Sequence, residues 1–249
     1  MPISYKTELH ARFGEDVDLG GDGGDHPDSP WLRQVLMRRT HRRFNDRPVP
    51  RSRVKLLLAT AVSASSKSDF QQISIIVVED RMRRNRLAEL FPDMPWIGTA
   101  PVFLVFCGDA RRLDRLGAQF GLSPDTGTFE FFFNATVDAA LALQTCVLAA
   151  ETMGLGCCPI SVLRNRIGEV AEILSLPDRV FPVAGLCIGY PDQAGFISMR
   201  LPMEATVHRD GYDDSGLADA VEAYDRRRDK RFSIADRQRA PEKFGVSPF

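Results

Sequence analysis

The sequence has no excess of charge of either sign. Its 249 residues include 32 Lys and Arg against 33 Asp and Glu, which leaves a formal net charge of −1 and a sequence isoelectric point of about 6.4. Proteins that hold nucleic acid or an anionic membrane by general electrostatic attraction carry a basic excess. The charge balance therefore argues against both kinds of partner.

A long hydrophobic run is also missing. The most apolar stretch, Ala135 to Ala150, contains Asp138, Gln144 and Thr145. A membrane span needs about 18 or more apolar residues in succession. The N-terminus has charged residues spread among polar ones and lacks the apolar core of a secretion signal. We therefore expect a cytoplasmic protein with no membrane partner.

Signatures of the common catalytic and metal sites are absent. The sequence contains no GxSxG, HExxH, GxGxxG or Walker pattern, and its four histidines show no metal-ligand spacing. The five cysteines are odd in number, and the adjacent Cys157 and Cys158 form no CxxC pair. We expect buried thiols, no metal, and no nucleotide site of the Rossmann or P-loop kind.

The apolar pattern that is present predicts a mixed α+β chain, with helices covering a sheet. Helices are expected from Pro30, near residues 51–62, and over Asn134–Met153, Ile167–Leu174 and Leu217–Arg231; strands are expected over Ile73–Val78, Val102–Cys107 and Val180–Ile188. The flanks divide the chain into an acidic, Gly- and Asp-rich mobile arm (1–30), a central domain (31–212) and a C-terminal helical extension (213–249).

The helix expected over Asn134–Met153 is apolar on every side. Such a helix must be covered all round, which places it either in the core of one domain or at the interface of a dimer.

Two polar segments could bind a ligand. Residues 38–43 hold four arginines and a histidine around Thr40, a set able to pair with a phosphate group. The alternative is a solvated basic helix end. Residues 64–72 gather hydroxyls, a carboxylate and amides directly before a predicted strand, where they could read the polar edge of a heterocycle. The alternative there is an ordinary polar loop.

Five segments taken together resemble the nitroreductase family of FMN-dependent oxidoreductases. In the family's order they are RRTHRRFNDRPV (38–49), SASSKSDFQQISIIVVED (63–80), DAALALQTCVLAAETMGLGCCPI (138–160), ILSLPDRVFPVAGLCIGYP (173–191) and MRLP (199–202). The sequence is most similar to the NADPH-preferring, oxygen-insensitive nitroreductase and flavin reductase branch. The resemblance implies a mixed, mainly antiparallel sheet covered by helices in an FMN-binding domain, and a homodimer built on the long central helix.

The resemblance also implies where FMN binds. The implied contacts are Arg38, Arg39, Thr40, Arg42, Ser65, Ser66, Asp69, Gln71, Pro159, Ile160, Ser161, Val162 and Arg200. Asp69 stands where the family has Asn, and Ser198 stands where it has the lysine of its late phosphate-binding motif. Pro159 has no N–H, so Ser161 or Val162 is the expected backbone donor to the flavin.

The implied reaction is ping-pong. NADPH or NADH reduces FMN, and a small-molecule acceptor such as a nitroaromatic, a quinone or a free flavin then takes the electrons. No catalytic side chain is expected. The basic run Arg226–Arg231 could read the 2′-phosphate of NADPH or be a solvated charged face. Alternative functions are a specialised family member, such as a reductive dehalogenase or a flavin-consuming enzyme, and a flavin-binding protein with little turnover.

Overall fold

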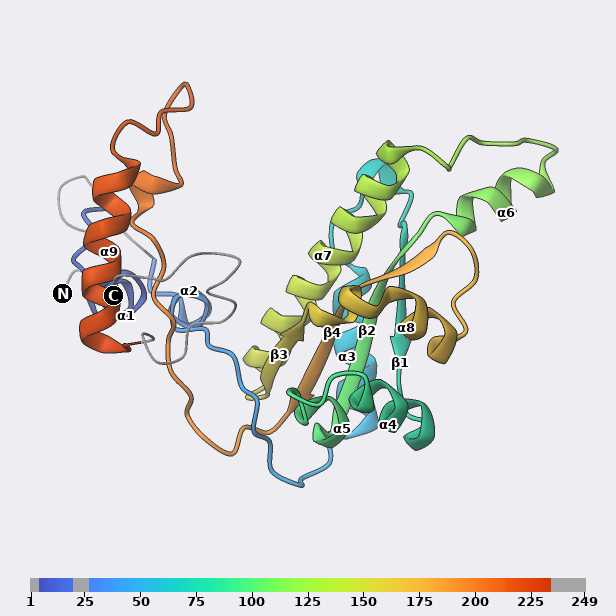
Figure 1. The fold of residues 1–249 in the computed structure, drawn as a ribbon, viewed down its shortest axis with the longest axis horizontal. Coiled ribbons are helices and arrows are strands. Elements are labelled where there is room, and N and C mark those ends of the chain that lie inside the picture. Colours follow the sequence, from blue (N-terminus) through green and yellow to red (C-terminus); the bar gives the residue numbers. More distant parts are fainter. Residues whose placement is uncertain (1–4, 20–26, 234–249) are drawn as a thin grey trace. The chain divides into compact units, whose positions relative to one another are not determined.

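The computed structural model describes residues 5–19 and 27–233 (Figure 1). The chain forms two compact units. One consists of residues 39–195, and the other combines the two ends of the chain, residues 1–38 and 196–249. The larger unit contains all the strands of the sheet, and the regular elements described in the smaller one are helices and a 3-10 turn.

The larger unit is built on a four-stranded sheet whose pairings are all antiparallel. The strands lie in the order β1 (Ile73–Val77), β2 (Val102–Asp109), β4 (Val180–Gly189) and β3 (Gly156–Ile160). Its helices are α3 (Arg51–Val62), α4 (Arg81–Glu89), α5 (Trp96–Thr99), α6 (Arg111–Gln119), α7 (Phe129–Thr152) and α8 (Ile167–Leu174), with 3-10 turns η1 (Lys67–Asp69) and η2 (Val162–Arg166). The predicted α+β class and mainly antiparallel sheet are confirmed.

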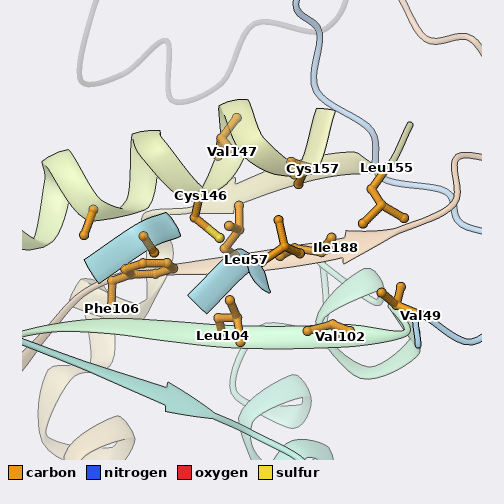
Figure 2. Close-up of a cluster of buried hydrophobic side chains, with 14 of the residues drawn as sticks. Val49, Leu57, Val102, Leu104, Phe106, Cys146, Val147, Leu155, Cys157 and Ile188 are labelled. Carbon is orange, nitrogen blue, oxygen red and sulfur yellow. The ribbon is translucent and has the colours of Figure 1, made fainter. Parts of the chain in front are cut away.

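Helices cover both faces of this sheet. Every residue of β2 is buried, and alternate side chains point to opposite faces, as the period of a strand requires. Leu104 and Phe106 pack with α3 and α7, including Leu57 and Cys146 (Figure 2). The intervening side chains, including Phe103, pack toward α4, α5 and α8. The continuous apolar run of β2 is therefore a strand buried on both faces.

Helix α7 begins at Phe129 rather than at Asn134. The Thr128 side chain caps it by accepting a hydrogen bond from the backbone N–H of Phe131 (3.4 Å). Among the described residues, α7 is the one helix long and apolar enough to cross a membrane, by length and composition alone. It packs on all four strands and on α3, which makes it the central helix of this unit.

All five cysteine thiols are buried, as expected. Burial raises the pKa of Cys107 and Cys146 to about 12, and it also raises the pKa of Cys187. A raised pKa keeps a thiol protonated at pH 8, with a thiolate fraction of about one in ten thousand for a pKa of 12.

We therefore expect the native protein not to react rapidly with Ellman's reagent. In guanidinium, which unfolds the chain, all five thiols should react. A rapidly reacting thiol in the native protein would contradict this burial.

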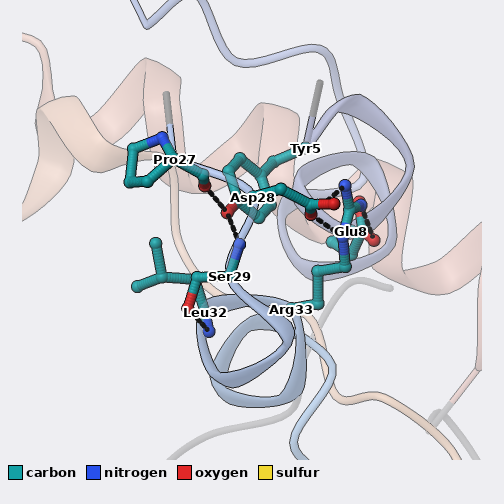
Figure 3. A network of polar contacts seen from close by, with 7 residues as sticks. All are labelled: Tyr5, Glu8, Pro27, Asp28, Ser29, Leu32 and Arg33. Atoms are coloured by element: carbon teal, nitrogen blue, oxygen red, sulfur yellow. Dashed lines mark hydrogen bonds and ion pairs between the residues drawn. The ribbon is translucent and has the colours of Figure 1, made fainter. Parts of the chain in front are cut away.

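The smaller unit contains helices α1 (Lys6–Phe13), α2 (Pro30–Leu36) and α9 (Leu217–Arg231), and the 3-10 turn η3 (Met203–Ala205). The Ser29 hydroxyl caps α2. The guanidinium of Arg33 pairs with Glu8 (2.6 Å) and Asp28 (3.3 Å), which joins α2 to α1 (Figure 3). That contact lowers the pKa of Glu8. Helix α1 lies in the N-terminal arm, where the sequence patterns predicted no helix.

The predicted basic run of α9 is paired within its own unit. Arg226 pairs with Glu222 and Arg228 with Asp225, while Arg227 reaches Glu15 of the N-terminal segment (2.9 Å). Helix α9 has the bounds expected from the sequence, Leu217–Arg231. Parts of the predicted arm and extension, residues 1–4, 20–26 and 234–249, lie outside the described residues.

Candidate functional site

The first group of predicted site residues follows the outer edge of β3. The backbone N–H of His41 donates to the carbonyl of Cys157 (2.9 Å), and its Nδ1 lies 3.1 Å from the carbonyl of Gln193. Arg39 Nη1 donates to the carbonyl of Ala194 (3.2 Å). Thr40 lies between these two anchored residues, so the segment is fixed along the edge strand.

The exposed Arg42 follows directly, and its guanidinium lies 5.7 Å from the centre of the Trp96 ring. Along β3 itself, Pro159 is exposed and Ile160 is buried. Ser161 comes next and is exposed, and Val162 begins η2. The structure thus brings Arg39, Thr40 and Arg42 to the strand edge that leads into residues 159–162.

Gly156 makes this close approach possible. A Cβ atom at this position would lie 2.8 Å from the Cβ and Cγ atoms of His41. Two carbon atoms cannot be that close, so any side chain must push the arginine-bearing segment away from β3.

We expect Gly156→Val to lower the free energy of unfolding by about 1–3 kcal/mol, the usual cost of overpacking. It should also weaken FMN binding, because residues 39–42 are displaced. Chemical denaturation and flavin titration measure the two effects. Gly168→Val is the matched control, since a Cβ at Gly168 meets nothing within 4 Å. Equal stability and flavin affinity in wild type and Gly156→Val would contradict the close packing.

The second group of predicted residues is the polar loop before β1, and a buried carboxylate organises it. Asp138 of α7 is only 2% exposed. Its Oδ2 accepts hydrogen bonds from Ser66 Oγ (2.7 Å) and from the backbone N–H of Gln72 (2.9 Å), and its Oδ1 accepts one from the backbone N–H of Lys67 (3.1 Å). Ser66 Oγ in turn accepts from the backbone N–H of Gln71 (2.7 Å). Asp138 therefore defines the path of the whole loop.

The loop needs this support because its backbone is strained. Ser68, Asp69 and Gln71 all have positive φ, at 52°, 57° and 50°. Residues other than glycine rarely adopt that region, and they persist there only where surrounding contacts hold them. Arg112 of α6 provides support from the other side by donating to the carbonyls of Gln71 and Ile73.

A cavity of about 640 Å³ lies against this loop. Its lining includes four predicted site residues together with the two residues that hold the loop: Ser65, Ser66, Asp69, Gln71, Arg112 and Asp138. Apolar side chains such as Ile73 and Ala142 complete it. Polar groups on an otherwise apolar wall suit a planar heterocycle.

Gln72 follows the predicted contact Gln71, and the sequence patterns gave it no role. Gln72 is fully buried, and neither atom of its side-chain amide has a hydrogen-bond partner within the described part of the chain. An unpaired buried amide is costly. The predicted residues that line the cavity do offer side-chain donors and acceptors for the N–H and carbonyl groups on the pyrimidine edge of a flavin, so the residues of this loop fit the expected group.

The remaining predicted residues, Arg38 and Arg200, belong to the smaller unit. The carbonyl of Arg38 accepts a hydrogen bond from Arg12 Nη2, and the backbone N–H of Arg200 donates to the carbonyl of Arg12 (2.8 Å). Arg12 thus connects two residues that are far apart in the sequence. The sequence patterns gave no indication of this connection.

The two groups of predicted site residues in the larger unit lie at opposite edges of the sheet. One follows β3 and the other leads into β1, and these are the two edge strands. Neighbouring strands are about 4.8 Å apart, so the two edges are separated by about 14 Å. Within one chain, the two groups are therefore separate.

Known proteins share this sequence and this fold. A sequence model of the Nitroreductase family matches residues 35–190. An FMN reductase [NAD(P)H] of Bacillus subtilis is 36% identical over 199 residues, which cover 78% of this chain and 79% of the relative. An oxygen-insensitive NADPH nitroreductase of Salmonella typhimurium is 37% identical over 186 residues, which cover 74% and 75% of the two chains.

Solved structures agree with the sequence comparison. NfrA2 of B. megaterium superposes with a TM-score of 0.79 at 32% identity, covering 86% of this chain and 89% of its own. The NADPH:FMN oxidoreductase of Vibrio harveyi, solved in complex with NAD+, gives a TM-score of 0.75 at 30% identity and is covered over 99% of its length. On sequence and fold alike, this chain belongs to the nitroreductase family.

Proposed function

We propose that the protein is an FMN-dependent oxidoreductase that takes electrons from NADPH or NADH and passes them to nitroaromatics, quinones or flavins. The observation that carries this proposal is the loop over residues 65–71, whose predicted ligands Ser65, Ser66, Asp69 and Gln71 line one cavity. Two of the relatives reported above are named as an FMN reductase and a nitroreductase, and an NADPH-flavin oxidoreductase of Vibrio harveyi is a further relative at 34% identity.

The residues proposed to hold FMN have different roles. Arg38, Arg39 and Arg200 supply charge for the phosphate group. Arg42 supplies positive charge where negative charge develops on the ring. Ser161 or Val162 supplies a backbone N–H, and the loop before β1 meets the pyrimidine edge. When bound, FMN itself accepts the hydride and releases the electrons to the acceptor, so no side chain needs to act as acid or base.

We further propose a homodimer, in which the loop of one copy meets the β3 edge of the other. Helix α7 supports this arrangement, since Phe129, Phe133, Val137 and Leu141 recur at every fourth position and are all exposed. An apolar stripe of this kind on a helix favours burial against a partner surface. The two-fold axis of a dimer would bring together the two groups that one chain keeps at opposite sheet edges. We assign the enzyme to the cytoplasm.

Steady-state kinetics of the FMN-loaded protein without oxygen test the proposed function. Initial rates of NADPH oxidation at several fixed concentrations of a quinone should give parallel double-reciprocal lines, because the donor leaves before the acceptor binds. Intersecting lines would contradict the ping-pong order. FMN-loaded protein that does not oxidise NADPH with a nitroaromatic, a quinone or free FMN would favour the alternative of a flavin-binding protein with little turnover.

A further inference from the structure

One arginine of the N-terminal segment, Arg12, contacts the backbone near both Arg38 and Arg200, two residues expected to bind the phosphate group of FMN. Arg12 is 7% exposed. Its Nε donates to the carbonyl of Leu36 (2.8 Å), its Nη1 to the carbonyl of Ser198 (2.8 Å) and its Nη2 to the carbonyl of Arg38. One guanidinium therefore holds two backbone segments, the end of α2 and residues 198–200, that are far apart in the sequence.

The backbone of Arg12 also contacts the segment that its side chain holds. The backbone N–H of Arg200 donates to the carbonyl of Arg12 (2.8 Å). The end of α1 also lies against the same segment, because Gly14, at a φ of +74°, leaves no room for a Cβ beside the Met199 side chain. Arg38 and Arg200 are thus fixed relative to each other through Arg12 and the turn that follows it. A guanidinium suits this task, since its planar fork offers several donors in fixed directions.

Helix α9 holds the Arg12 segment in place. Arg231 Nη1 donates to the carbonyl of Ala11 (3.0 Å), and Arg227 Nη2 donates to Glu15 Oε1 (2.9 Å). Arg12 and its partners at 198–200 both lie outside residues 35–190, which match the family model.

We propose that Arg12 is the positioning residue of the FMN phosphate site. It ties the backbone at Arg38 to the backbone at residues 198–200 and adds a positive charge next to Ser198, which has none of its own. The inference rests on the proposed function, because it requires that FMN is the ligand. It predicts a specific defect: loss of Arg12 weakens recognition of the phosphate group and leaves recognition of the ring unchanged.

Riboflavin separates the two effects, because it has the ring and ribityl chain of FMN but no phosphate. We would measure equilibrium dissociation constants of the full-length protein for FMN and for riboflavin by flavin fluorescence. For wild type we expect tighter binding of FMN. In Arg12→Gln we expect FMN binding to weaken about tenfold or more, as the loss of charge-assisted hydrogen bonds predicts, with riboflavin binding changed less than about twofold.

Arg33→Gln is the matched control, since Arg33 pairs with Glu8 and Asp28 on the same N-terminal segment. It should leave both constants unchanged. If circular dichroism shows that Arg12→Gln does not fold, the same two dissociation constants are measured for Arg12→Lys. Lysine keeps the positive charge but cannot reach three carbonyls at once. A wild-type ratio of FMN to riboflavin affinity in the folded Arg12 variant would overturn the inference. Wild-type protein that binds neither flavin would instead overturn the proposed function.

Discussion

Replacement of Asp138 by Ala should lower the free energy of unfolding by about 3 kcal/mol, because each buried donor left without its acceptor costs about 1–3 kcal/mol. The substitution leaves the backbone N–H groups of Lys67 and Gln72 and the Ser66 hydroxyl without their acceptor. The positive-φ residues that these bonds hold would relax, so the affinity for FMN should fall as well. Urea denaturation and flavin titration measure the two losses.

Two further variants make the Asp138 result specific. Asp138→Asn keeps one acceptor oxygen in place and should lie between wild type and Asp138→Ala in both measurements. Asp178→Ala removes an exposed carboxylate from the same unit and should change neither. If Asp138→Ala retained wild-type stability, Asp138 would not be what holds the loop.

Leu141→Asp should convert the proposed dimer into a monomer and abolish tight binding of FMN. Leu141 is 41% exposed on α7, in line with Phe133 and Val137. A carboxylate introduced at the centre of an apolar interface is buried without a partner and strongly opposes association. Because the proposed flavin site combines the loop of one copy with the β3 edge of the other, a monomer has only half of it.

Sedimentation velocity with and without FMN measures this effect, and circular dichroism shows whether the chain stays folded. Met82→Asp is the matched control, since Met82 is 76% exposed on α4 and lies away from the stripe on α7. It should leave the dimer intact. A Leu141→Asp variant that remains dimeric would place the interface elsewhere, and a monomer that binds FMN tightly would contradict the shared site.

The elements that the sequence predicts well are those set by local patterns. Helices α8 and α9 have their predicted bounds, and the apolar runs before Val77 and after Val102 are strands. The start of α7 was placed too late, because the pattern was judged from Asn134 onward while the cap is Thr128. Local periodicity predicts that an element exists more reliably than where it ends.

The candidate site depended on contacts that sequence order does not reveal. Asp138 appears in the sequence only as an interruption of an apolar stretch, although it is the acceptor for a loop more than sixty residues earlier. Arg12 lies in the segment that the sequence predicts to be a mobile N-terminal arm. In each case the signal is a long-range hydrogen bond.

The central claim is that FMN is bound and reduced by this protein, and an anaerobic visible spectrum tests it most directly. Purified protein with FMN added would be recorded before and after one equivalent of NADPH, and again after a quinone. Our account predicts a perturbed flavin spectrum that bleaches rapidly with NADPH and recovers with the quinone. An FMN spectrum that the protein leaves unperturbed, and that NADPH does not bleach, would contradict the cofactor assignment and every residue assigned to the site.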